Sequence, residues 1–191
     1  LENQPGSGAI YAFVNYVGLY RTFDDGASWQ FVSAIPDFPK GLGICHASPS
    51  TMYYTAWPLD KVMKSTDGGF TWSPTPAIPG PANCYESLAV DPTDPNRVFV
   101  SGESTDKVYR TTDGGQTWQV VHNLTNSPDW GNRAAWSITI DPTNPQRVYL
   151  ATYNHPWRSD DGGNTWVMQD TLHYTINYGG SLKDTSFVRK I

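Results

Sequence analysis

The sequence predicts an all-β fold built from about four repeated units, each a small antiparallel sheet of four short strands. Three observations support this prediction. One eight-residue segment occurs four times at nearly regular spacing. Short runs of β-branched and aromatic residues, separated by clusters of Gly, Pro, Asp and Asn, surround each copy, as expected for strands joined by turns. No long stretch places apolar residues at the spacing of an amphipathic helix.

The recurring octet has the chemistry of a folded turn. Its four copies span residues 22–29, 65–72, 111–118 and 159–166. The third position of every copy is an aspartate, and these aligned aspartates, 43, 46 and 48 residues apart, are Asp24, Asp67, Asp113 and Asp161. A period of this size is typical of solenoids and propellers. A hydroxyl two residues before the carboxylate favours local backbone hydrogen bonds, and the glycine two residues after it allows a positive φ.

Each octet ends in a tryptophan that we expect to plug the turn against the sheet. These residues are Trp29, Trp72, Trp118 and Trp166. Four copies of a catalytic acid in one chain would be redundant, whereas repeated sheets each need a turn of their own. We therefore interpret the four aspartates and four tryptophans as structural.

The octets follow the pattern S/T-x-D-x-G-x-S/T-W and resemble the Asp-box, or bacterial neuraminidase repeat. Similar repeats occur in sialidases, xyloglucan-active glycoside hydrolases, sortilin-type receptors and a photosystem II assembly factor. The resemblance covers residues 9 to about 168 and implies a β-propeller of four-stranded blades. It also implies that each box clips the turn between the third and fourth strands, at the outer edge and away from the binding face.

Aligning the repeats divides a single propeller domain, or propeller fragment, into blades. The predicted blades cover approximately 9–33, 43–74, 86–122 and 136–168, with a tail at 169–191. The first unit opens on residues that align with second strands, so we expect its innermost strand to be missing. The tail could supply that strand near Lys183 to Arg189 and close a four-bladed ring. Otherwise the chain is part of a larger propeller or associates with a second copy.

Length and composition limit the possible functions. The chain has 191 residues, 38% hydrophobic and 16% charged, with a net charge of −5 and no basic cluster, which disfavours nucleic acid and anionic membranes as partners. No apolar run approaches the ~20 residues of a membrane-spanning helix. The two cysteines, Cys45 and Cys84, either form one disulfide between neighbouring blades or remain buried thiols. No histidine or cysteine spacing predicts a metal site, and no motif predicts a cofactor.

Function is expected among residues that do not repeat, on the face opposite the boxes. Exposed aromatic rings beside polar groups are suited to sugars or peptides, and the predicted ligand-binding residues are Trp57, Trp130, Trp136, Tyr153, His155 and Arg133. Other candidates on this face include Tyr16, Asp37 and Lys40. Four cations at one repeated position beside the boxes are interpreted as strand-surface charges: Arg21, Lys64, Arg110 and Arg158.

The sequence favours an extracytoplasmic module, secreted or at the cell surface, that binds a glycan or a protein or peptide. One alternative is a glycoside hydrolase fragment similar to xyloglucanases or sialidases, which needs two carboxylates about 5–10 Å apart. Its candidate carboxylates are Glu86, Glu103 and Asp60. The second alternative is an architectural subunit of a surface assembly. Fold resemblance alone does not choose among these functions.

Overall fold

The computed structural model is an all-β fold, as predicted. It describes residues 8–57, 61–79, 87–102, 106–124, 135–152 and 155–169, and also the backbone of the strands at 2–4, 175–178 and 181–184. The first sheet contains β1 (Glu2–Gln4), β2 (Ala9–Val14), β3 (Gly18–Thr22) and β4 (Gln30–Ala34). The second contains β5 (Phe38–Cys45), β6 (Ser48–Trp57), β7 (Val62–Ser65) and β8 (Ser73–Pro74).

Two further sheets repeat this plan. The third contains β9 (Ser87–Val90), β10 (Val98–Ser101), β11 (Lys107–Thr111) and β12 (Gln119–Asn123). The fourth contains β13 (Ala135–Ile140), β14 (Val148–Thr152), β15 (Pro156–Ser159) and β16 (Val167–Met168). The strands of each sheet pair antiparallel in chain order. A separate hairpin joins β17 (Thr175–Tyr178) to β18 (Ser181–Asp184).

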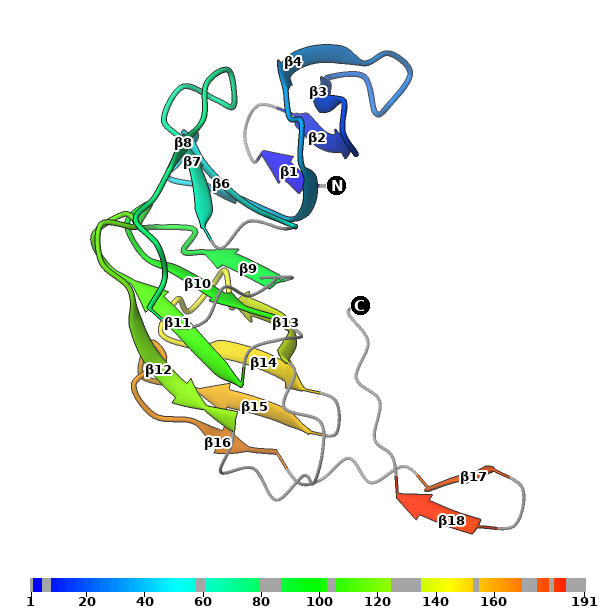
Figure 1. Cartoon of the computed structure of the whole chain (residues 1–191), viewed down its shortest axis with the longest axis vertical. Helices are drawn as coiled ribbons and strands as arrows, with labels where there is room; N and C mark the ends of the chain where they lie inside the picture. Colours follow the sequence, from blue (N-terminus) through cyan, green and yellow to red (C-terminus); the bar gives the residue numbers. More distant parts are fainter. Residues whose placement is uncertain are drawn as a thin grey trace.

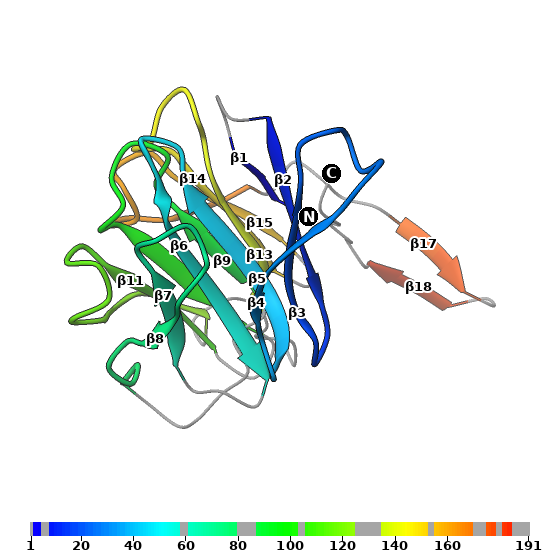
Figure 2. The same cartoon turned by 90° about the horizontal axis from the view of Figure 1, so that it is seen from above.

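The four sheets follow one another like the blades of a propeller. The first strand of each sheet contacts the first strand of the next, from β1 to β5, β9 and β13, so these strands are innermost. Figure 1 shows the series running from β1–β4 at one end to β13–β16 at the other, with β17–β18 apart from it. Figure 2 shows the same sheets from above, with the strands of neighbouring sheets inclined to one another. The described sheets form an open series.

Burial of the second strands shows how neighbouring sheets cover one another. All four residues of β10 are buried, although strands with one solvent-facing side normally alternate. The third sheet is covered on both faces, which explains the continuous burial. In β14, by contrast, Val148 and Leu150 are buried while Tyr149 between them is exposed. One face of the fourth sheet is therefore uncovered among the described residues.

Three apolar clusters lie at the junctions between sheets. Leu19 and Tyr11 of the first sheet pack with Met52 and Tyr54 of the second. Tyr53 packs with Val98, Val100 and Tyr109 of the third sheet, and Phe99 joins residues of the fourth. The innermost strands approach closely because β5 carries glycines: a Cβ on Gly43 would lie 2.5 Å from Leu88 Cδ2. Core burial is thus distributed between blades, as expected for repeats that cannot bury a face alone.

The first sheet corrects one expectation. Its innermost strand is not missing, because Glu2–Gln4 pairs antiparallel with β2, with Asn3 opposite Ile10. These three polar residues next to a proline show no apolar alternation and therefore carry no strand signal of their own. The described part of the predicted tail strand pairs elsewhere: Lys183 lies opposite Ile176 in the hairpin. Residues 185–191 lie outside the described residues.

Cys45 is a free, buried thiol at the end of β5. Its Sγ lies 3.6 Å from the carbonyl oxygen of Pro92, to which the thiol donates. Burial raises the pKa of the Cys45 thiol, so the group behaves as a small apolar side chain of low reactivity. Of the two alternatives for the cysteines, the structure places Cys45 in the thiol form; Cys84 lies outside the described residues.

Candidate functional site

The four octets form turns whose aspartates are saturated by their own backbone and hydroxyls. In the third copy, the hydroxyl of Thr111 donates to Asp113 Oδ1 (2.7 Å) and accepts the N–H of Gly115 (2.9 Å). Thr117 donates its N–H to Asp113 Oδ1 (2.9 Å) and its hydroxyl to Oδ2 (2.6 Å). The same bonds recur in the other three turns.

This hydrogen bonding makes the octet aspartates more acidic than ordinary aspartates. The hydroxyl and N–H of the residue four positions later, followed by the preceding hydroxyl, lower the pKa of Asp24, Asp67 and Asp113 to about 2. The pKa of Asp161 is lowered by the same bonds. A carboxylate that accepts all these donors is ionised at neutral pH and has no capacity left for general acid chemistry. The geometry therefore supports the structural interpretation.

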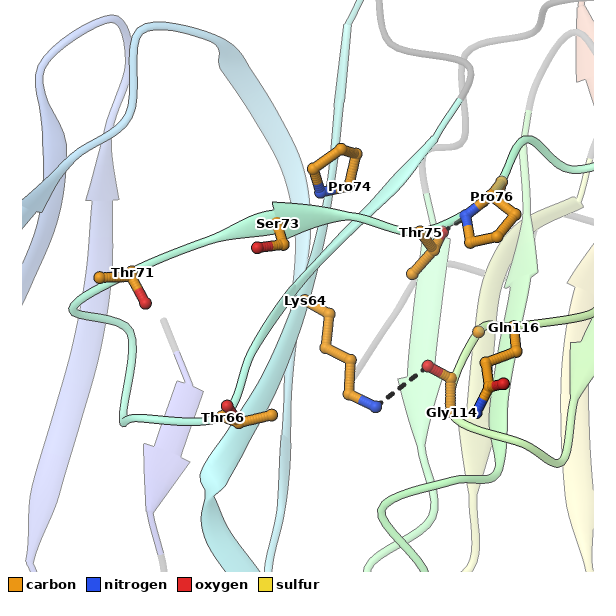
Figure 3. A pocket seen from close by; sticks show the side chains of 10 residues that line it. Lys64, Thr66, Thr71, Ser73, Pro74, Thr75, Pro76, Gly114 and Gln116 are labelled. Carbon is orange, nitrogen blue, oxygen red and sulfur yellow. Dashed lines mark hydrogen bonds between the residues drawn. The ribbon is translucent and has the colours of Figure 1, made fainter.

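The octet turns also join neighbouring sheets, and this corrects the interpretation of two cations. Lys64 does not simply project from a strand surface, because its Nζ donates to the carbonyl oxygen of Gly114 in the next sheet (3.1 Å; Figure 3). Arg110 donates in the same way to Gly162 (2.6 Å) and also to Asn164 Oδ1 (2.9 Å). Both cations link one sheet to the next, a role that a single repeat cannot reveal.

A hollow of about 280 Å³ accompanies the Lys64 bond (Figure 3). Ser73, Pro74 and Thr75 line one side and Gly114 and Gln116 the other, so the hollow is the wedge between the edge of the second sheet and the third octet turn. Its lining supplies hydroxyls, an amide and a lysine already bonded to a carbonyl. The described residues that line it include no carboxylate, histidine or cysteine. We therefore interpret the hollow as a seam between sheets.

A second cavity, of about 260 Å³, lies among the innermost strands β5, β9 and β13. Apolar residues dominate its lining, among them Leu42, Val90 and Ile140, and His46 stands at one side. Within the part of the chain that the structure describes, no carboxylate belongs to this lining. The cavity therefore lies at the centre of the fold, where the innermost strands of the second, third and fourth sheets face the region around which the sheets are arranged. Its described walls lack the pair of acids that glycoside hydrolysis needs.

The predicted ligand-binding residues that the structure describes all lie at the sheet ends opposite the octet turns. Trp57 ends β6 and is 50% exposed. Trp136 lies near the start of β13 and is also exposed. His155 follows β14, where its N–H donates to Thr152 Oγ1 (3.2 Å) and its carbonyl accepts from the same hydroxyl (2.7 Å). The other candidates lie outside the described residues: Asp60, Glu86, Glu103, Trp130, Arg133 and Tyr153.

The structure groups Trp57 with residues from the first two sheets in what we call the aromatic cluster: Tyr16, Phe38, Lys40 and Trp57. Phe38 lies directly opposite Trp57 in the β5–β6 pair. The ring of Tyr16 lies 5.7 Å from the ring of Phe38, and the ammonium of Lys40 lies 5.1 Å from the same ring. Sequence reasoning indicates Tyr16, Trp57 and Lys40 but misses Phe38, whose only signal is its position one residue after Asp37.

Backbone geometry holds Tyr16 in an unusual position at the edge of the aromatic cluster. Its φ is 60°, in the left-handed region that bulky residues rarely adopt. Its N–H donates to the carbonyl oxygen of Asp37 (3.1 Å), which fixes the turn against the second sheet. The side-chain carboxylate of Asp37 in turn accepts the hydroxyl of Tyr54 (3.1 Å). The Tyr16 side chain nevertheless remains 63% exposed.

The chain has the features of an Asp-box β-propeller. Each blade has four strands with the first strand innermost, and each carries an octet turn whose aspartate accepts hydrogen bonds from its own turn. The model of the Sortilin-Vps10 family, described as sortilin, neurotensin receptor 3, matches residues 18–136. The chain belongs to this family. No protein with a curated description matches the sequence.

Solved structures show the same fold. A xyloglucanase of glycoside hydrolase family 74 from Xanthomonas campestris is 18% identical, with a TM-score of 0.70 over 90% of this chain and 30% of its own. The Nidogen/Laminin complex matches at 15% identity and a TM-score of 0.68, over 94% of this chain and 68% of the other. YCF48 bound to D1 peptide matches at 19% identity and a TM-score of 0.53, over 73% and 42%.

The likeness to the family 74 enzymes is limited in extent. The chain spans 22% to 30% of the length of three such enzymes, among them one from Niastella koreensis and an ancestral one. At identities of 18% to 21% the likeness concerns the fold.

Among the described residues, no group of three or more His, Cys, Asp or Glu side chains could hold a metal ion. No helix in that part of the chain is long and apolar enough to cross a membrane.

Proposed function

We propose that the chain is an extracytoplasmic binding module that holds a protein or peptide ligand on the face opposite the Asp-boxes. The observation that carries the proposal is the aromatic cluster. Two of its side chains, Tyr16 and Trp57, are at least half exposed, although they contact or face the partly buried Phe38. Tyr and Trp are the residues that most often dominate the binding energy of protein interfaces.

The geometry of Tyr16 supports a binding role for this cluster. A bulky residue with positive φ is strained by about 1–3 kcal/mol, and such strain persists where the surrounding structure imposes it, often at binding sites. Here the Tyr16–Asp37 backbone bond imposes it, and the result is a projecting ring rather than a buried one. Lys40 and the nearby Asp37 add charges of both signs, which can orient a polar peptide.

Relatives give further support. The family model is described by the name of a receptor, neurotensin receptor 3. Among the structural neighbours, nidogen is in complex with laminin and YCF48 is bound to a D1 peptide. These proteins share the propeller fold and occur with protein or peptide partners, which is the use we infer for this chain.

Glycan binding is the second candidate, and the exposed faces of Trp57 and Trp136 favour it. An aromatic face can cover the apolar side of a sugar ring while polar neighbours bind its hydroxyls. Hydrolysis of a glycan by a xyloglucanase- or sialidase-like carboxylate pair has no support from the described residues. Its candidates, Asp60, Glu86 and Glu103, lie outside them. An architectural role would leave the aromatic cluster without a purpose.

A binding screen tests the proposal. Immobilised chain should enrich peptides from a displayed library, and the enriched peptide should bind in titration calorimetry. Trp57→Ala or Tyr16→Ala should weaken that peptide by about tenfold or more, the effect of a typical interface hot spot. Phe70→Ala is the matched control, because Phe70 is equally exposed but belongs to the Asp-box face.

Three outcomes are informative. Peptide binding that both variants leave unchanged would exclude this face as the site. Enrichment of glycans on an array, lost in Trp57→Ala, with no peptide binding would replace the first candidate by the second. Recovery of the native protein from the cytosol, and not from the medium or cell surface, would contradict the proposed location.

A further inference from the structure

Two Asp-boxes depart from the repeat pattern where the first sheet meets the second. Phe23 stands at the second octet position, where the other copies carry threonine or aspartate. Phe70 stands at the sixth position, where the other copies carry alanine, glutamine or asparagine. The two rings are 51% and 52% exposed. The octet turn does not need either ring, because the third and fourth boxes form the same hydrogen bonds without them.

Arg21 lies close to both of these rings. Its guanidinium carbon is 5.1 Å from the centroid of the Phe23 ring and 5.4 Å from that of Phe70. Both distances are within the ~6 Å over which a guanidinium is attracted to an aromatic ring. We call these three residues the Arg21 site. Arg21 belongs to β3 of the first sheet and Phe70 to the box of the second, so the site spans a junction that the structure describes on both sides.

Arg21 differs from the equivalent cations in its lack of an acceptor. Lys64 and Arg110, at the same repeated position, each donate to a glycine carbonyl of the next box. Within the described ranges no carbonyl or carboxylate accepts a hydrogen bond from Arg21, and its Nε is buried without a partner. Arg110 also leaves its Nε unpaired, but its Nη1 is bonded to Gly162 and Asn164. The Arg21 guanidinium is therefore held by aromatic rings, with its donors uncommitted.

The missing acceptor indicates the chemistry of a ligand. A guanidinium that stacks on aromatic rings presents a planar fork of N–H donors, which matches the two oxygens of a carboxylate. Partly buried polar groups are normally paired, so a ligand that brings an acceptor completes Arg21. The exposed faces of Phe23 and Phe70 are suited to apolar side chains beside that carboxylate. Arginine and aromatic residues are also enriched at protein interfaces.

Charge favours a single carboxylate over a phosphate or a run of acidic residues. Phosphorylated and strongly acidic segments are typically bound by clusters of arginines, whereas the Arg21 site has one cation. The aspartates of the two adjoining boxes, Asp24 and Asp67, are bonded within their own turns and add negative charge. The whole chain has a net charge of −5. A ligand with several negative charges is therefore repelled, and a single carboxylate much less so.

We propose that the Arg21 site binds a segment of a protein partner in which one glutamate or aspartate is flanked by apolar side chains. The carboxylate accepts from the Arg21 fork, and the flanking side chains pack on Phe23 and Phe70. The site lies on the Asp-box side of the sheets. It is therefore separate from the aromatic cluster, and the chain engages partners at both ends of its sheets.

Peptide titration tests the assignment. The probes are short capped peptides with one central glutamate and varied apolar neighbours, each paired with a version that carries glutamine instead. The chain should bind the best glutamate peptide about tenfold more tightly than its glutamine version, because hydrogen bonds between charged groups are the stronger ones. Arg21→Met, which keeps the apolar stem, should abolish this preference. Phe23→Thr and Phe70→Gln should each weaken the glutamate peptide by about fivefold, through lost apolar contact.

The controls separate binding from folding. Threonine and glutamine occupy the same positions in other boxes, so both phenylalanine variants should keep the fold, which circular dichroism checks. Arg158→Met removes the cation at the same repeated position of the fourth sheet and should leave the glutamate peptide unaffected. In proton–nitrogen NMR spectra, the Nε–H signal of Arg21 should shift with the glutamate peptide and remain in place with the glutamine version.

Four results would overturn the proposal. They are no binding by any glutamate peptide, equal binding of the glutamate and glutamine versions, a preference for glutamate that survives Arg21→Met, and an Arg21 Nε–H signal that does not respond. Tighter binding of a phosphoserine peptide than of the glutamate peptide would contradict the choice of a single carboxylate. No residue of the aromatic cluster is varied, so the result is independent of the function proposed above.

Discussion

Arg110 Nη1 lies 2.6 Å from the carbonyl oxygen of Gly162, which belongs to the next blade and is 52 residues away in the sequence. The bond joins a partly buried cation to a backbone carbonyl, and hydrogen bonds to charged groups contribute about 1.5–3 kcal/mol. Arg110→Met should lower the free energy of unfolding by that amount, because it keeps the apolar stem and removes the donor. Urea denaturation followed by tryptophan fluorescence measures it.

Arg158→Met is the matched control for this prediction. Arg158 holds the same position in the fourth sheet but pairs with the exposed Asp160, and exposed ion pairs contribute about 0–1 kcal/mol. The comparison should be made at low protein concentration, so that association does not contribute. Equal losses in the two variants would mean that the cation stabilises its own strand and not the junction.

A glycine pair separates backbone strain from packing between blades. Gly163 and Gly26 hold the same Asp-box position, with φ of 89° and 94°. Alanine at either site costs about 1–2 kcal/mol for the left-handed conformation. At Gly163 the added Cβ would also lie 2.6 Å from the buried Phe99 ring, and such overpacking costs about 1–3 kcal/mol more.

Gly163→Ala should therefore lower the urea midpoint clearly more than Gly26→Ala does. Differential scanning calorimetry of the two variants and the parent chain gives an independent measure. If both substitutions destabilise equally, the fourth Asp-box does not pack on the third sheet as tightly as these distances indicate.

The order of strands in each blade could be predicted from the repeats, because the octet forms a recognisable turn that always joins the third strand of a sheet to the fourth. Thr111, Asp113 and Gly115 lie close in sequence, so their mutual bonds could be inferred from spacing alone. The strand at Phe38–Cys45 was harder: its predicted blade began at 43, since a proline and two glycines obscure the strand pattern. Those glycines are explained by Leu88 of the next sheet, which lies so close that a Cβ at either position would crowd it, and this contact is distant in sequence.

The candidate site was predictable only in part, for a similar reason. Trp57 and Tyr16 could be assigned to one face from blade topology, but their association through Phe38 depends on how two blades meet. The same applies to Lys64, which looks like a surface cation within its own repeat and is bonded to the next one. Contacts between repeats require the rotation from blade to blade, and a sequence period does not contain it.

Acid should unfold the chain through its Asp-boxes. Hydrogen bonding lowers the pKa of Asp24, Asp67 and Asp113 to about 2, below the ordinary value of about 3.9 in an unfolded chain. A depressed folded pKa gives stability that is complete above the unfolded pKa and is lost as pH falls through the folded one. Stability should therefore fall steeply between about pH 4 and pH 2, as measured by urea midpoints across that range.

One hydroxyl tests the cause of this lowered pKa. Thr117→Val removes the shortest bond to Asp113, the 2.6 Å contact from Thr117 Oγ1 to Oδ2, and should raise the pKa of Asp113 toward the ordinary value. Carboxyl NMR titration of the folded protein reports that pKa directly. Thr112→Val, at the exposed neighbouring position, should leave it unchanged. A pKa for Asp113 that stays near 2 in the Thr117 variant would assign the effect to the remaining donors, the backbone N–H of Thr117 and the hydroxyl of Thr111.

Near neutral pH, His122 should also make stability depend on pH, because burial rather than hydrogen bonding lowers its pKa. Its ring lies 4.7 Å from the Trp157 ring and 5.4 Å from the Trp166 ring, and burial lowers its pKa below the ordinary value of about 6.5. The unfolded chain then binds a proton that the folded chain excludes. Stability should be complete above about pH 6.5 and should decrease as pH falls from there toward the folded pKa.

His122→Phe should abolish that decrease, because phenylalanine fills the space between the two tryptophans without titrating. The measurement is the urea midpoint at one pH above and one below the ordinary histidine pKa, with His46→Gln as the control at an exposed histidine. The size of the decrease at each pH gives the folded pKa, since a difference of one between the folded and unfolded pKa corresponds to about 1.4 kcal/mol. A decrease that persists in the phenylalanine variant would mean that another group carries the proton linkage and that His122 accepts its charge within the fold.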